Sequence, residues 1–348
     1  MFSSALRATL IALAASAVSV SAAPGLSLKV SGGDAFTGVE NMKVATTITN
    51  TGDETLKLIN DVRGALHTLP TNAFAVSSES GETPAFVGVK AKYSLDTVAA
   101  SASDEDFTVL APGASFTLTH DLSKAYNFTT SGEGKYTIEA SNLFHYVDAE
   151  GKVQELRADA EAHVAALSGK LAVSRPLERR ASYNGCSSSR QSSLVTAASS
   201  AQSYAASALS YLNSHTSSTT RYTTWFGTYT SSRHSTVQSH FSKISGGSYS
   251  SFTYDCTCTD SGTYAYVYPS DYGHIYLCGA FWSAPNTGTD SRAGTLIHEA
   301  SHFTANGGTD DYVYGQSSAK SLASSNPDHA VFNADNHEYF AENNPSQS

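Results

Sequence analysis

Residues 294–303 constrain this chain most, because they set His-Glu-x-x-His within a mostly apolar run that contains no proline. The spacing of the apolar residues predicts a helix. On a helix, His298 and His302 lie roughly 40° apart on one face, so both imidazoles can reach one metal ion. Glu299 stands beside them, turned toward whatever the metal activates. A chance match on a surface helix is the alternative, but the apolar surroundings favour a partly buried site.

A catalytic zinc ion normally takes three protein ligands and leaves its fourth position to water, so a third ligand must come from elsewhere in the chain. One common class continues His-x-x-Gly-x-x-His, but Ala305 and Gly308 occupy the last two of those positions, which excludes that class. A glutamate from a later helix is a second source, and Glu338 is available. An aspartate from the loop after the helix is the third source, and both Asp310 and Asp311 qualify.

The length and charge of the chain limit what it can be. A chain of 348 residues can hold two domains of ordinary size. The net charge of -10 and the lack of a Lys/Arg-rich run argue against nucleic acid or an anionic membrane as a partner.

The N-terminus predicts export. Arg7 gives a positive start, residues 10–18 form an apolar run, and residues 20–22 offer small side chains for cleavage, which is the pattern of a signal peptide. No later apolar run approaches the 18 or more residues of a membrane span, so we expect a soluble, secreted product. Asn127 begins a glycosylation acceptor, which fits a surface loop of an exported protein.

All four cysteines lie in the second half of the chain, and an even count in an exported protein favours two disulfides. Cys256 and Cys258 are separated by one residue and should not pair with each other. Two connectivities with Cys186 and Cys278 therefore remain open.

The first half, residues 24–175, has an all-β pattern. Alternating apolar residues near positions 42–48, 56–58, 116–120 and 136–138 predict short strands separated by turns, as in a small β-sandwich. Its four histidines are scattered, so we interpret each as structural and expect no chemistry in this half.

A basic linker divides the chain. Arg179 and Arg180 follow a proline and precede the first cysteine, which suggests a processing site. We therefore expect a signal peptide at residues 1–22, a β-rich pro-domain at 23–181 and a catalytic domain at 182–348. Residues 24–181 contain no cysteine, so a thiol cannot cap the metal, and any inhibition must be steric or use another residue type.

The second half predicts an α+β layout with a mainly helical core and a small sheet. Helical spacing covers residues 192–213 and 237–244, and strand patterns follow at 252–254, 264–268 and 274–278. The metal helix begins near residue 293, a further helix covers 316–325, and a last one covers 328–341 with Pro327 at its start.

These motifs together resemble a known family. His298-Glu299-x-x-His302 followed by Gly308-Thr309-x-Asp311-x-x-Tyr314-Gly315 resembles the aspzincin signature of the deuterolysin family of metalloproteases. The whole segment 182–348 is similar to the lysine-directed endopeptidases of that family, including residues 256–258, 276–282 and 333–340. The resemblance implies a zincin-like fold for this segment.

The resemblance also implies roles for individual residues. Zinc would be held by His298, His302 and Asp311, with Glu299 as general base and Tyr314 stabilising the transition state. Asp310 would be solvated or would support the site from outside. The implied disulfides are Cys186–Cys256 and Cys258–Cys278.

A preference for lysine is the last implication. Asp335 and Glu338 are three residues apart on the last helix, so they share a face. Most such pairs are simply solvated, but in this family they would form the acidic wall that accepts a lysine after the cut bond. An ammonium with three donors suits two separated carboxylates. Residues 182–348 contain two lysines and residues 1–181 contain nine, which fits a lysine-directed protease.

We therefore expect a secreted, monomeric zinc endopeptidase, made as a proenzyme, that cuts lysine-containing proteins and peptides before lysine. Besides substrates, its partner would be its own pro-domain, with neither nucleic acid nor membrane involved. Two alternatives remain. One is a zincin of different specificity that uses Glu338 as its third ligand, and the other is a catalytically silent secreted binding module.

Overall fold

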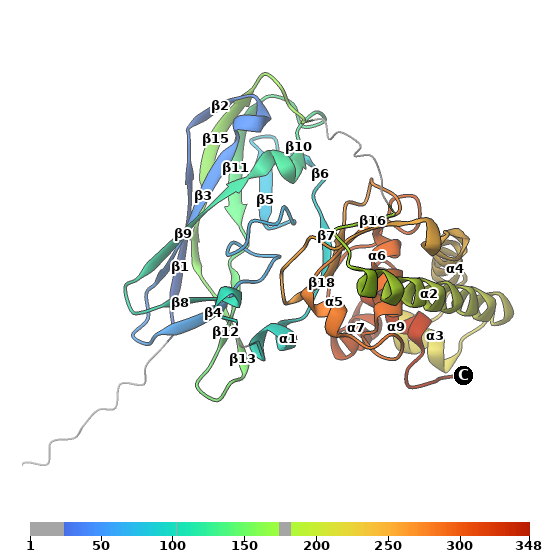
Figure 1. Ribbon diagram of the computed structural model, residues 1–348. Helices are drawn as coiled ribbons and strands as arrows, with labels where there is room; N and C mark the ends of the chain where they lie inside the picture. The colour runs from blue at the N-terminus through green and yellow to red at the C-terminus, as the bar shows by residue number, and fades with distance from the viewer. Residues whose placement is uncertain (1–23, 102, 174–181) are drawn as a thin grey trace, which may run out of the picture.

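The computed structural model describes residues 24–101, 103–173 and 182–348. The predicted signal peptide at 1–22 and the basic pair Arg179-Arg180 lie outside these residues. Figure 1 shows a tall layered set of strands beside a compact helical body, so the molecule mixes helices and sheets. No helix of the described residues is both long and apolar enough to cross a bilayer.

The first half is built mainly of strands because polar and apolar residues alternate along them. β3 (Lys43–Asn50), for example, buries every second side chain against one core. Its three large sheets have the strand orders β14-β1-β3-β9, β2-β15-β11-β5 and β13-β12-β4-β8, and β6 pairs with β10. One short α-helix, α1 (Leu95–Ala99), and three single-turn 3-10 helices at 39–41, 104–106 and 122–124 interrupt the all-β pattern. The remaining strands are β1 (Leu26–Gly32), β2 (Ala35–Thr37), β4 (Leu56–Ile59), β5 (Phe74–Ser78), β6 (Ala85–Phe86), β8 (Phe107–Leu110), β9 (Ser115–Asp121), β10 (Tyr126–Asn127), β11 (Gly134–Ala140), β12 (Leu143–Val147), β13 (Val153–Arg157), β14 (Asp159–Glu161) and β15 (His163–Ser168).

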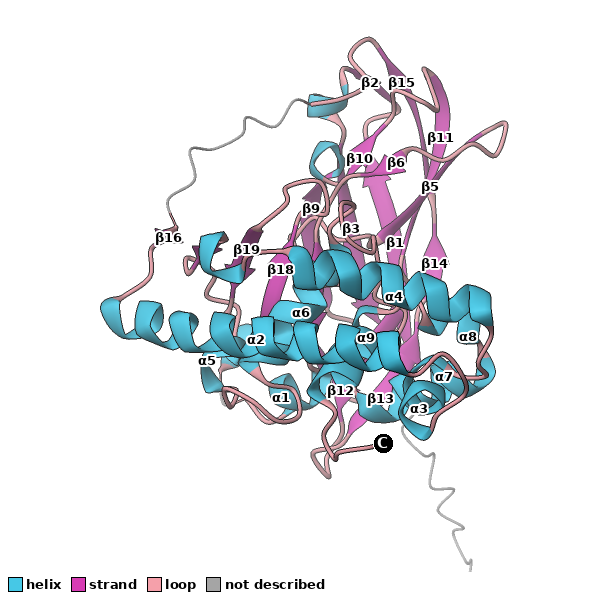
Figure 2. Cartoon of the chain, turned by 90° about the vertical axis from the view of Figure 1, so that its right-hand side faces the viewer, coloured by secondary structure: helices cyan, strands magenta, loops and turns pink. Residues whose placement is uncertain are grey.

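The second half surrounds a central helix. α6 (Arg292–His302) packs against α2, α4 and α9, and Figure 2 shows α2 and α4 crossing in front of it. The other helices are α2 (Ser188–Ser214), α3 (Thr220–Phe226), α4 (Ser231–Gly246), α5 (Gly279–Ser283), α7 (Gln316–Ser325), α8 (Pro327–Ala330) and α9 (Ala334–Glu342). The strands are β16 (Tyr183–Asn184), β17 (Thr253–Asp255), β18 (Thr263–Val267) and β19 (His274–Leu277).

Helix α2 has the apolar stripe that its sequence predicts. Leu194, Leu212 and five alanines between them are buried. Alanine side chains allow neighbouring helices to approach closely, which brings α6 and α4 against the same face of α2. Ser187 begins the helix as its cap and accepts a hydrogen bond from the backbone N–H of Arg190, an interaction that typically stabilises a helix by about 1 kcal/mol.

The last predicted helix is wrong as a single element. Residues 327–342 form two helices, α8 and α9, with Pro327 in the first turn of α8 as expected. Asn333 breaks the run because its backbone is extended and pairs as an isolated bridge with Asp310. The break therefore ties the start of α9 to the loop that follows α6.

Both disulfides implied by the resemblance are present. Cys186 joins Cys256, which ties the start of the second half to the end of β17, and Cys258 joins Cys278 at the end of β19. Each crosslink typically stabilises a fold by about 2–4 kcal/mol, and here both fix the small sheet beside α6.

One strand crosses between the halves. β7 (Lys90–Tyr93) belongs to the first half in sequence but pairs antiparallel with β18, and the sheet order is β16-β17-β19-β18-β7. Figure 1 shows β7 at the boundary between the two bodies. The second half therefore receives the last strand of its sheet from the first half.

Candidate metal centre and acidic pocket

Helix α6 positions the two histidines in a fully buried environment. Ser291 caps the helix by accepting a hydrogen bond from the backbone N–H of Gly294. Every residue from Ala293 to His302 is buried, so the helix is enclosed on all sides. The rings of His298 and His302 have centroids 4.8 Å apart, as expected for side chains one turn apart.

Asp311 meets both histidines. Its Oδ1 atom lies 3.1 Å from Nε2 of His298 and 3.3 Å from Nε2 of His302. These three atoms have no hydrogen-bond partner among the described residues, although each is buried. In a tetrahedral zinc site with bonds of about 2.0–2.1 Å, neighbouring ligand atoms are about 3.3 Å apart. The three atoms therefore fit a zinc ion.

The charges at this centre also favour a cation. Burial disfavours a charged imidazole, but the carboxylates of Asp311 and Asp335 outweigh burial and raise the pKa of His298 well above its usual value. Burial also opposes ionisation of Asp311, yet His302 and His298 hold its pKa well below the usual range. Positive charge is thus stabilised where the three ligand atoms meet.

The two other candidates for a third ligand face elsewhere. Asp310 contacts the ammonium of Lys90 and accepts a hydrogen bond from the backbone N–H of Asp311. Glu338 lies on the opposite side of His298, with Oε2 3.5 Å from Nδ1 rather than from Nε2. Only Asp311 lies beside the Nε2 atoms of both histidines among the residues considered as third ligand.

A second set of contacts orients the histidines. The Nδ1 atom of His298 lies 2.8 Å from Oδ1 of Asp335, and Nδ1 of His302 lies 2.9 Å from the carbonyl oxygen of Thr309. Such contacts fix the tautomer and direct the opposite nitrogen to the metal. Asp335 also accepts a hydrogen bond from the backbone N–H of Gly315, so both of its oxygens are already engaged. Asp335 lines a cavity together with Lys92 and Asp290. Its direct contacts, however, are with His298 and Gly315 and not with a lysine ammonium.

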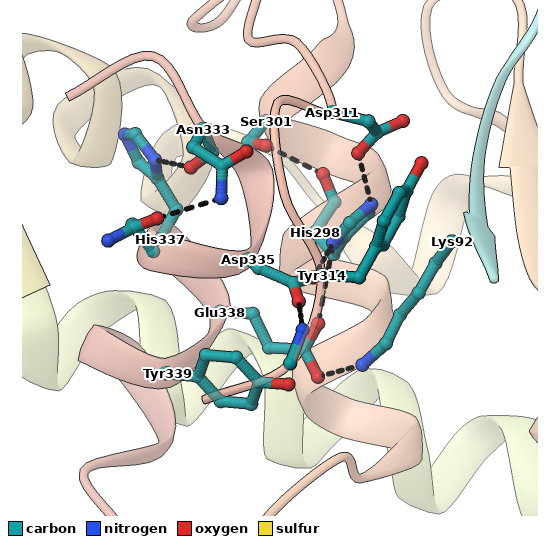
Figure 3. Close-up of polar contacts among 12 residues, drawn as sticks. Lys92, His298, Ser301, Asp311, Tyr314, Asn333, Asp335, His337, Glu338 and Tyr339 are labelled. Atoms are coloured by element: carbon teal, nitrogen blue, oxygen red, sulfur yellow. Dashed lines mark hydrogen bonds and ion pairs between the residues drawn. The ribbon is translucent and has the colours of Figure 1, made fainter. Parts of the chain in front are cut away.

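Asn333 holds the loop that carries Asp311. Its side-chain oxygen accepts hydrogen bonds from the backbone N–H groups of Tyr312 and Val313, and its amide donates to the carbonyl of Val313 and to Asn336. Figure 3 shows this side chain to the left of Asp311 and His298. Sequence reasoning missed this role, because the loop residues that Asn333 binds are 20 and 21 positions away and become neighbours only through the break before α9.

Glu299 and Tyr314 lie beside the three convergent atoms. Glu299 is fully buried, and neither oxygen has a hydrogen-bond partner in the described structure. Burial raises the pKa of Glu299 to about 7, while His298 and His302 counteract part of that rise. The ring of Tyr314 lies 6.4 Å from that of His298, and burial raises its pKa well above the usual value, so its O–H remains a donor.

An acidic pocket adjoins the centre, and Figure 3 shows Glu338 and Lys92 close to His298. Glu338 is completely buried and contacts the ammonium of Lys92, a residue of β7. Asp290 adds a second carboxylate 3.2 Å from that ammonium and accepts a hydrogen bond from the hydroxyl of Tyr339. Burial opposes the charge on Lys92, but Glu338, Asp335 and Asp290 raise its pKa well above the usual value.

The first half therefore contacts the site, a contact that our expectation of no chemistry in this half did not include. Lys92 fills the acidic pocket, Lys90 contacts Asp310, and the guanidinium of Arg63 lies 4.6 Å from the ring centre of Tyr314. The four scattered histidines of the first half gave no indication that other residues of this half reach the site. No periodic pattern distinguishes Lys92 from the other lysines of this half.

Comparisons with known proteins show the family of this chain. Residues 211–342 match the family model described as lysine-specific metallo-endopeptidase (aspzincin). The peptidyl-Lys metalloendopeptidase of Grifola frondosa is 62% identical over 352 aligned residues, and that of Armillaria mellea is 58% identical, each alignment covering all of both chains. A solved zinc peptidase from Grifola frondosa is 67% identical, with a TM-score of 0.47, and the match covers 47% of this chain and 100% of that one.

Proposed function

This chain belongs to the aspzincin family of lysine-specific metallo-endopeptidases, and we propose that it is a zinc endopeptidase that hydrolyses peptide bonds on the N-terminal side of lysine. The observation that carries the proposal is the convergence of His298, His302 and Asp311 on one point, beside a buried carboxylate that contacts an ammonium group.

His298, His302 and Asp311 would hold the zinc ion. When bound, zinc lowers the pKa of its water to about 7 and polarises a carbonyl group. Asp335 and Thr309 would keep the two imidazoles directed toward it, because each accepts a hydrogen bond from an Nδ1–H.

Glu299 is the proposed general base. Its carboxylate would accept a proton from the attacking water and then return it to the nitrogen of the leaving amine. A pKa of about 7 suits both steps near neutral pH, because the group can gain and lose a proton at little cost. The lack of a strong hydrogen bond leaves both oxygens able to do so.

Tyr314 is the proposed donor to the carbonyl oxygen. Its hydroxyl already donates a hydrogen bond of 2.8 Å to a peptide carbonyl, that of Ala91. As negative charge develops on such an oxygen, the hydrogen bond strengthens, and this stabilises the transition state more than the bound substrate.

The preference for lysine would come mainly from Glu338, supported by Asp290. Glu338 is buried, so its charge acts at low dielectric and favours a cation at the end of a long side chain. The rings of Tyr264 and Tyr339, 4.7 and 5.9 Å from the ammonium of Lys92, add cation–π attraction. Asp335 would contribute to this preference indirectly, by orienting His298 and by adding negative charge near the substrate ammonium.

The organisation of the chain is part of the same proposal. Residues 182–348 would be the catalytic domain and residues 23–181 a pro-domain removed near Arg179-Arg180. Two disulfides support export to an oxidising compartment, which fits the predicted signal peptide and an extracellular site of action.

The test is a digest of a mixed peptide pool, with mass spectrometry identifying the residue after each cut. We expect cuts before lysine with zinc and none with a chelator. Cuts before other residues at comparable rates would favour a zincin of different specificity. No cuts in either condition, after the linker has been cleaved, would favour a silent binding module.

A further inference from the structure

Strand β7 occupies the edge of the catalytic sheet in the manner of an extended peptide. It pairs antiparallel with β18, with Ala91 opposite Tyr266 and Lys92 opposite Ala265. Peptides often bind by adding a strand to an exposed sheet edge, with alternate side chains entering pockets. Here the added strand comes from the chain itself.

The side chain of Lys92 enters the pocket proposed for a substrate lysine. Lys92 is the one buried lysine among the described residues, with 3% of its surface exposed. Its ammonium contacts Glu338 (Figure 3). The same ammonium lies 3.2 Å from Asp290. Lys90, two residues earlier, contacts Asp310 outside the pocket.

The carbonyl group before Lys92 meets a proposed catalytic residue. Tyr314 donates its hydrogen bond of 2.8 Å to the carbonyl oxygen of Ala91. Ala91 and Tyr314 also line one cavity together with Asp311, a proposed zinc ligand. The carbonyl that hydrolysis of this bond would attack therefore lies beside the donor that would stabilise it.

A buried ion pair without further role is the alternative reading. Such a pair needs a carboxylate partner, but it does not require the preceding carbonyl, that of Ala91, to accept a hydrogen bond from Tyr314. Desolvation makes buried ion pairs weak sources of stability, so stability alone does not account for the arrangement.

We propose that Ala91–Lys92 is bound in this active site as an internal substrate, which blocks the site against other peptides until this bond is cut by the enzyme itself. The inference rests on the proposed function. In the step, the oxygen of water bonds to the carbonyl carbon of Ala91 and the C–N bond breaks. A proton passes through Glu299 to the nitrogen, which leaves a carboxylate on Ala91 and a free amine on Lys92.

One test needs no catalysis. In the full chain carrying E299Q, hydrogen–deuterium exchange of residues 88–95 is measured while a lysine peptide is added. Displacement of β7 by the peptide should speed the exchange of these residues. The peptide concentration that gives half of the maximal increase in exchange should be at least tenfold lower in E299Q/K92M than in E299Q. A peptide with norleucine in place of lysine should displace far less, and E299Q/K90M should behave as E299Q does. No response in either chain, or equal responses, would overturn the inference.

The second test needs no variant at Lys92. Zinc is added to the metal-free full chain, and the masses of the fragments are followed with time. Ala91–Lys92 should be the first lysine bond cut, at a rate independent of protein concentration, with little cleavage of an added lysine peptide before it.

If the peptide is cut at once while Ala91–Lys92 stays intact, the inference fails but the proposed function stands. If zinc-loaded chains never cut lysine peptides, the proposed function fails, and the exchange measurement still reports on pocket occupancy.

Discussion

Two acidic sites lie on opposite sides of the His298 ring, and they differ in whether the chain itself supplies a cation to balance their negative charge. On the Nε2 side, Asp311 and the two imidazoles leave three buried atoms without a hydrogen-bond partner in the described chain. On the Nδ1 side, Glu338 contacts a cation that the chain supplies, Lys92. A site with all polar atoms directed at one point and no partner requires an external ion, whereas a site of similar charge with a tethered ammonium does not.

Removing a ligand of the first site should have the largest effect. We expect D311A to lose its bound zinc and to lower activity by at least about a thousandfold, because two imidazoles alone hold zinc weakly. Zinc content by elemental analysis and cleavage of a lysine peptide measure both effects. The matched control is D310A, since Asp310 contacts Lys90 instead, and it should keep its zinc. Zinc retained in D311A but lost in E338A would move the third ligand to Glu338.

Removing the base should come next. We expect E299Q to keep its zinc and to lose about 10²–10⁴-fold in kcat, because the amide cannot accept the proton of the attacking water. Kinetics on a lysine peptide, together with zinc content, measure the change. A rate within a few-fold of the native rate would exclude Glu299 as the general base.

The second site should govern specificity and not metal binding. We expect E338Q to lower the preference for lysine over norleucine by roughly 30-fold or more, since losing one member of a buried charge pair typically costs about 2–5 kcal/mol. D328N is the control, because Asp328 pairs with Arg233 at the surface. An unchanged preference in E338Q would separate this pocket from lysine recognition.

Replacing Asp335, which lies between the two sites, should have the smallest effect. The variant distinguishes a role in orienting His298 from a role in the wall of the lysine pocket. We expect D335N to weaken zinc binding about 10- to 100-fold by disturbing the orientation of His298, while the preference for lysine changes little. A chelator competition gives the zinc affinity, and the ratio of lysine to norleucine cleavage gives the preference. A large loss of preference with normal zinc affinity would instead make Asp335 part of the pocket wall.

Local pattern explains what could be predicted from the sequence. His298, Glu299 and His302 lie within one helical turn, so their spacing alone predicts a shared face, and Asp311 follows in the next loop. The strands of the first half and helix α2 likewise follow from alternation and helical spacing.

Long-range contacts explain what could not. Asn333 lies at the start of α9, after the break that follows α8, and binds the Asp311 loop; no local preference predicts that break. Asp290 and Lys92 reach the pocket from positions 198 residues apart. Lysine counts showed that the first half is richer in lysine, but the choice of Lys92 depends on which strand pairs with β18.

The pairing of β18 has a consequence for the proteins that this enzyme can degrade. When β7 leaves, β18 becomes an open edge whose backbone groups can be matched only by a chain in extended form. The backbone N–H and C=O groups of a lysine inside a helix are already hydrogen-bonded within that helix, so this lysine cannot pair with the open edge. We therefore expect unfolded proteins and loose tails to be digested readily, while lysines on intact helices of the same proteins survive.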